Sequence, residues 1–185
     1  MTTRFLCLLS ILVFTGSLAS EPQSKEESAF ANGVRKYVEL QQYLEGSVSA
    51  QKSTNESEQI TYRQQQLAGL IANARLDAYQ GEVFTREVTE QFHKIIRKAF
   101  REPGGLAMRK TIQERDPVKP IVLKVNEVYP DDQPRTTMPP TLLNRLPVLP
   151  KELAYRIIGR ALVLQDTKTN LIVDFIPNAI PLKQK

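Results

Sequence analysis

The sequence predicts a single α+β domain in which N-terminal helices pack on a C-terminal β-hairpin or small antiparallel sheet. Through residues 29–115, apolar side chains recur three and four positions apart, as on one face of a helix. Two runs rich in Ile, Val and Leu, 155–166 and 171–176, flank a short polar stretch, which indicates a hairpin. Residues 117–150 hold eight of the twelve prolines and are expected to be extended, because proline fixes φ and lacks a backbone N–H.

The helical half divides into four predicted segments. A first helix is expected over 29–45 and a second over about 56–79, with Gly81 in a left-handed cap after it. Thr85 is a suitable N-cap for a third helix, because its hydroxyl can accept a hydrogen bond from the first turn. After the break at Pro-Gly-Gly, a weaker helix is expected over 106–115.

The proline-rich segment is interpreted as a belt that holds spaced apolar side chains against the core. Within it, 121–125 is predicted as a short third strand and 142–146 as a helical turn. The alternative is a recognition segment, because polyproline conformers bind partners with little loss of entropy. In the hairpin, Gly159 inside the first run predicts a bulge or a close backbone approach.

Residues 1–20 have the three parts of a cleavable signal peptide. Arg4 precedes a twelve-residue apolar run, and small residues follow up to Ser20. A helix of that length rises about 18 Å, whereas a bilayer core requires roughly 20 apolar residues. We therefore predict cleavage near Ala19 or Ser20, then a flexible stretch over 21–28 and one domain over 29–185.

The single cysteine, Cys7, lies inside the predicted signal peptide, so the mature chain would be free of cysteine. Disulfides are common in small secreted domains of eukaryotes. Their absence here favours a bacterial protein, periplasmic or secreted, with an ordinary hydrophobic core. No later stretch reaches the length of a transmembrane helix.

The candidates for catalysis are few. His93 is the only histidine, which excludes multi-histidine zinc sites, and its cationic neighbours indicate a solvated surface position. Asp174 alternates with Ile172 and Ile176 and is expected to share a strand face with them, partly buried. A buried carboxylate needs a partner, so we predict a structural ion pair of Asp174 with Arg156 or Arg160, the alternative being a catalytic acid.

The best candidate for binding is a row of cations near the end of the third helix. Their spacing of three and four places them on one face, where an anionic glycan, lipid headgroup or acidic protein could bind. The alternative role is stabilisation of the helix dipole. No aromatic residue interrupts the row, so a nucleic-acid partner is not expected. The row consists of Lys94, Arg97, Lys98 and Arg101.

Several stretches of the C-terminal half resemble a family of small secreted bacterial proteins of unknown function. The resemblance rests on 123–130, 138–143, 146–150, 155–160 and 170–176. It implies export and a single domain, and it carries no enzyme activity, cofactor or catalytic residues.

Together these observations predict a non-enzymatic binding or envelope-support domain with no cofactor and no metal. Its partner would be an anionic envelope component or a protein. The alternative is a hydrolase-like envelope enzyme that uses Asp174 with an arginine, or His93 with a serine.

Overall fold

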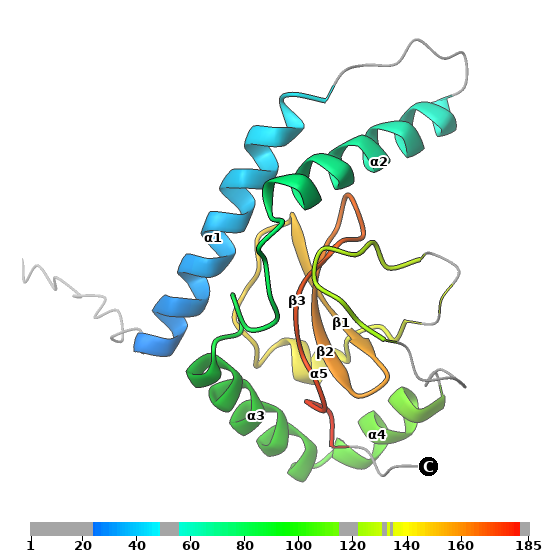
Figure 1. The fold of residues 1–185 in the computed structure, drawn as a ribbon. Helices are drawn as coiled ribbons and strands as arrows, with labels where there is room; N and C mark the ends of the chain where they lie inside the picture. The colour runs from blue at the N-terminus through cyan, green and yellow to red at the C-terminus, as the bar shows by residue number, and fades with distance from the viewer. Residues whose placement is uncertain (1–23, 49–55, 115–121, 131–132, 134, 182–185) are drawn as a thin grey trace, which may run out of the picture.

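The computed structural model describes residues 24–48, 56–114, 122–130, 133 and 135–181, and it shows an α+β fold. Helices lie on one side of a three-stranded antiparallel sheet (Figure 1). The elements in chain order are α1 (Lys25–Glu45), α2 (Glu56–Ala74), α3 (Arg86–Arg101), α4 (Gly105–Glu114), α5 (Pro140–Leu143), β1 (Leu153–Ile158), β2 (Ala161–Asp166) and β3 (Ile172–Ile176).

Helix α1 begins at Lys25, four residues before the predicted start. Ser24 and Glu27 form a reciprocal capping box: the Ser24 hydroxyl accepts from the Glu27 amide at 3.1 Å, and the Glu27 carboxylate accepts from the Ser24 amide at 3.3 Å. Part of the stretch predicted to be flexible is therefore helical.

Helix α2 ends at Ala74, five residues before the predicted end. Ile60, which was expected to face inward, is exposed, whereas Leu67 and Ile71 are buried. Gly81 has the predicted positive φ of 96°, but it lies in the turn before α3 and does not cap α2. Helix α3 begins after Thr85 as predicted, because the Thr85 hydroxyl accepts from the Val88 amide.

The sheet is a β1-β2-β3 meander, so the run predicted as one strand over 155–166 is two strands. Gly159 and Arg160 form the two-residue turn between them, and Gly159 has a φ of 57°. A two-residue hairpin turn with positive φ at its first position suits glycine, which has no Cβ to clash. Apolar residues stand directly before and after these two turn residues, so no clear sign in the sequence marks the end of the strand there.

Residues 122–130 of the proline-rich segment pack on the second face of the sheet, and bridges from the segment reach both sheet edges. The predicted strand at 121–125 is absent from the described part, 122–125. Instead, Val128 bridges Leu171 beside β3, and Thr136 bridges Ile157 on β1. Tyr129 and Leu123 pack on the sheet face opposite the helices, in a cluster with Ile158, Ala161, Val163 and Ile172.

The main core lies between the helices and the other face of the sheet. A group of aromatic rings from three elements and the 84–85 turn forms its centre, with centroid separations of 5.1–6.5 Å. Leu142 and Leu146 close the core from the belt, whereas Leu143 is 45% exposed. The rings are those of Phe30, Phe84, Phe92 and Tyr155.

Candidate binding surface

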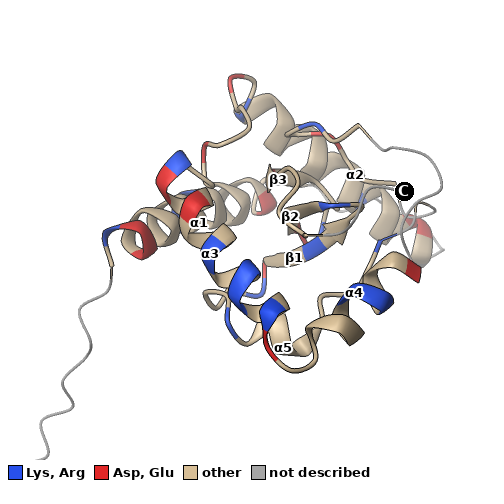
Figure 2. Cartoon of the chain, turned by 90° about the horizontal axis from the view of Figure 1, so that it is seen from below, with Lys and Arg blue, Asp and Glu red and all other residues tan. Residues whose placement is uncertain are grey.

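The four predicted cations line one hollow on the outer side of α3. All four are exposed, and Glu102 completes the lining. Figure 2 shows the positions of Lys and Arg along the ribbon of α3, with further ones on α4. We call Lys94, Arg97, Lys98 and Arg101 the α3 cations.

None of the α3 cations takes part in an ion pair within the described part of the chain. The nearest acid along the chain, Glu102, is bound by both terminal nitrogens of Arg145. The other acids of α3, Glu87 and Glu90, lie in its first half. The second half of α3 therefore carries positive charge without an ion-pair partner among the described residues, and the helix dipole stabilises the two cations of the last turn, Lys98 and Arg101, by about 0.3–1 kcal/mol each.

His93 lies beside this surface and is half-buried. Partial burial, and then the positive charge of Arg97, lower the pKa of His93 below its ordinary value. Among the described residues no serine is hydrogen-bonded to it, so the Ser–His pair of the enzyme alternative is not assembled there. The pKa of His93 is therefore linked to the positive charge of this surface through Arg97.

Asp174 is fully buried, but its partners are not arginines. Its Oδ1 accepts from the amides of Gly81 and Phe175, and its Oδ2 accepts from those of Val83 and Phe84, all at 2.8–2.9 Å. A carboxylate offers about four lone-pair positions, and all of them are occupied. Asp174 thus fastens β3 to the turn before α3.

The ion pair predicted for Asp174 with Arg156 or Arg160 is wrong because of the sheet geometry. Arg156 pairs with Val163, which pairs with Phe175, so Arg156 faces away from Asp174. Arg160 lies in the β1–β2 turn, where its Nε donates to the Ile180 carbonyl.

The predicted alternation on one face is confirmed for Asp174 and Ile176 and is wrong for Ile172. A bulge leaves Val173 without a partner on β2, because Gln165 pairs with Ile172 and Leu164 pairs with Asp174. Ile172 therefore packs in the cluster on the opposite face.

A second buried carboxylate, Asp166, is also saturated with donors. The amides of Lys168 and Thr169 donate to its Oδ1, which is the turn role expected of an Asp at this position. The Tyr37 hydroxyl and the Gln41 side-chain amide donate to Oδ2, each at 2.7 Å. Burial and Asp166 raise the pKa of Tyr37 well above its usual range. Asp166 thus fastens β2 to α1.

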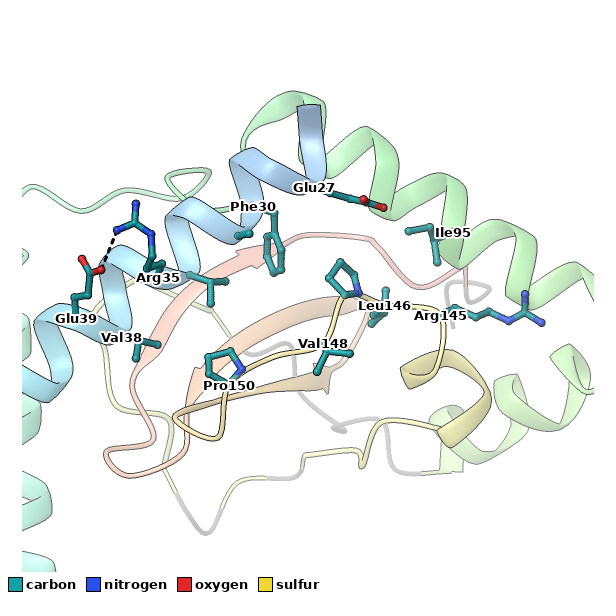
Figure 3. Close-up of a pocket in the computed structure, with 13 residues that line it drawn as sticks. Glu27, Phe30, Arg35, Val38, Glu39, Ile95, Arg145, Leu146, Val148 and Pro150 are labelled. Atoms are coloured by element: carbon teal, nitrogen blue, oxygen red, sulfur yellow. Dashed lines mark hydrogen bonds and ion pairs between the residues drawn. The ribbon is translucent and has the colours of Figure 1, made fainter. Parts of the chain in front are cut away.

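An apolar groove that sequence reasoning missed runs between α1 and residues 145–150. Its volume is about 620 Å³, within the range of roughly 300–1,000 Å³ typical of ligand sites. Figure 3 shows Phe30 and Val38 on the α1 side, with Val148 and Pro150 opposite. Val148 is 97% exposed, and Ile95 contributes to the lining from α3. No periodic pattern marks this groove, because its walls are far apart in the sequence.

Charged side chains stand at the ends of the groove. Arg35 and Glu39 pair with each other at 2.9 Å at one end. Glu27 and Arg145 lie at the other end, near Ile95 (Figure 3).

The described residues provide neither a metal site nor a transmembrane helix. No group of three or more His, Cys, Asp or Glu side chains in this part of the chain could hold a metal ion. No helix within the same residues is long and apolar enough to cross a membrane. Comparisons with protein-family models, curated proteins and solved structures found no match. The resemblance to a family of secreted proteins therefore stays a prediction.

Proposed function

We propose that this chain is a non-enzymatic binding domain that holds an anionic partner on the α3 cations. The single observation that carries the proposal is their arrangement: four exposed cations line one hollow and have no ion-pair partner within the described residues. Charges gathered on one surface attract an oppositely charged partner and accelerate its association. The saturated lone pairs of Asp174 argue against the hydrolase alternative, since a general base must have an oxygen free to accept a proton.

Binding to defined anionic probes tests the proposal. The probes are heparin, phosphatidylglycerol vesicles and polyglutamate, each measured at low and at physiological salt. We expect replacement of the α3 cations by glutamine to weaken binding to at least one probe by about tenfold or more, because electrostatic binding falls with the charge removed.

The control variant loses the same net charge elsewhere. Lys36, Arg63, Lys124 and Lys151 are exposed cations outside the α3 hollow, and all four are replaced by glutamine. We expect this variant to bind within about threefold of the wild type, a difference below 1 kcal/mol. Equal losses in both variants would show that net charge alone governs binding and would overturn the proposal.

We also propose that residues 1–20 are a signal peptide that directs export and is then cleaved. The protein would act in the periplasm or outside a bacterial cell. The basic, apolar and small-residue parts of this stretch support the proposal. Sequencing of the N-terminus of the protein recovered from cells tests it. A mature start near residue 20 or 21 is expected, and recovery of an intact Met1 terminus would contradict it.

A further inference from the structure

The α3 cations and the apolar groove form one continuous surface. Ile95 lines the groove, and Lys98 lies three residues further along the same helix. Residues three apart on a helix have Cβ atoms about 5–6 Å apart. Arg145 also lines the groove, and it pairs with Glu102, which lines the hollow of the α3 cations.

We infer that this joint surface docks a protein segment in which apolar residues adjoin acidic ones. The inference rests on the proposed function, because the acidic part would occupy the α3 cations. The apolar part would occupy the groove, where it would cover the exposed Val148 side chain. Short protein segments commonly bind in this way, with apolar side chains in a surface groove and charged side chains on a surface of opposite charge.

The charges within the groove determine which part of the segment lies where. Two acids and two arginines line it, and Arg35 neutralises Glu39 at 2.9 Å, so the groove offers an acidic side chain no net positive charge, whereas its apolar walls suit an apolar one. The α3 cations begin next to Ile95 and present the opposite sign. Because the charges that line the groove balance, the groove adds no attraction to an anionic membrane surface, and its volume of about 620 Å³ fits the side chains of a protein segment.

The dimensions set the length of the segment. From Lys94 to Arg101 the helix rises about 10 Å at 1.5 Å per residue. An extended chain covers that distance in about three residues at roughly 3.3 Å each. A segment with three or four acidic residues therefore matches the length of the row of α3 cations.

Three fluorescein-labelled synthetic peptides test the inference. Their binding to the protein purified from cells, with whatever N-terminus it has there, is measured by fluorescence anisotropy. The first joins an apolar block, Leu-Val-Leu, to Asp-Glu-Asp-Glu, and is made in both block orders. The second replaces the apolar residues by serine, and the third replaces the acids by glutamine and asparagine. We expect the first, in at least one order, to bind about tenfold more tightly than either of the others, a difference of about 1.4 kcal/mol.

Protein variants locate the two contacts. Ala31 and Val148 are exposed at the groove, so A31Q/V148Q should fold normally. This variant should bind the first peptide only as well as the second, while its affinity for the second is unchanged. L76Q/Y79Q, which alters exposed apolar residues elsewhere, is the matched control and should behave as the wild type.

The outcomes separate the two proposals. If the wild type binds the first and second peptides equally, the groove is not part of the site and the inference is overturned, although the proposed function stands. If vesicles or heparin bind to the α3 cations and no acidic peptide does, the partner is not a protein segment and the inference is again overturned. If replacement of the α3 cations changes no affinity, both proposals are wrong.

Discussion

The buried acids of the sheet and the exposed cations of α3 differ in how their charges are stabilised. Asp166 and Asp174 each accept four hydrogen bonds from within the chain. The α3 cations form no ion pair in the described structure. Removal of a charge from water is costly unless its lone pairs accept hydrogen bonds, so the buried acids need donors from within the chain. The cations of α3 are solvated and can still bind a partner. The comparison predicts large stability effects in the sheet and small ones on α3.

The largest effect is expected for Asp174→Ala. Four backbone amides would lose their acceptor, and an unsatisfied buried donor costs about 1–3 kcal/mol. Relaxation and water entry reduce the sum, so we expect the free energy of unfolding to fall by about 3–5 kcal/mol. Urea denaturation followed by circular dichroism measures it. Asp77→Ala, at an exposed acid, is the control, and equal losses in the two variants would contradict the role assigned to Asp174.

Tyr37→Phe should have the next largest effect, because it removes one of the four donors to Asp166. We expect a loss of about 1–3 kcal/mol at pH 7. The pKa of Tyr37 is raised in the folded state, so its contribution is fully present below pH 10 and is lost as the pH rises above the pKa of the unfolded chain. Above the pKa of the unfolded chain, a tyrosine that stays protonated in the folded state lowers the free energy of unfolding by about 1.4 kcal/mol per pH unit.

The slope of stability between pH 10 and 11 measures this linkage and should be shallower in Tyr37→Phe than in the wild type. Tyr43→Phe, at a 76% exposed residue, is the control. An unchanged slope in Tyr37→Phe would show that its hydroxyl is not sealed against Asp166.

Replacement of the α3 cations by glutamine should change stability by less than about 1 kcal/mol. The lost attraction to the helix dipole and the relieved repulsion among the cations oppose each other. Thermal and urea unfolding measure the change. A loss above about 2 kcal/mol would indicate that these residues have a structural role, as Asp174 does.

The smallest effect concerns His93. Its pKa lies below the ordinary value, chiefly through partial burial and then through Arg97. Since His93 is the only histidine, one imidazole signal in an NMR titration reports it directly. Arg97→Gln should raise this pKa part of the way toward its ordinary value, and so should an anion bound at the α3 cations. A pKa indifferent to both changes would place His93 outside the reach of this surface.

The features that the sequence predicts well are those set by neighbours along the chain. Helix α3 follows from the apolar spacing of Val88, Phe92 and Ile96 together with the Thr85 cap. The β2–β3 hairpin follows from the polar turn, and the α3 cations from their spacing on one helix. Each of these signals lies within about two turns of helix or one hairpin.

Features that depend on distant segments escaped prediction. Three of the four amides that bind Asp174 lie about ninety positions before it, and no local pattern points to them. The bulge at Val173 reverses the strand alternation, so Ile172 lies on the face opposite that expected. The groove requires α1 and the 145–150 segment to face each other, which only the folded chain establishes.

The two bridges of the proline-rich segment have a consequence for self-association. Val128 lies beside β3 and Thr136 pairs with β1, so a single short stretch occupies part of both edges of the sheet. An open strand edge is a template on which another chain can add. Release of this one stretch would uncover two such templates at once, and each molecule could then join a neighbour on either side. Val128 and Thr136 thus each block part of one sheet edge against the addition of another chain.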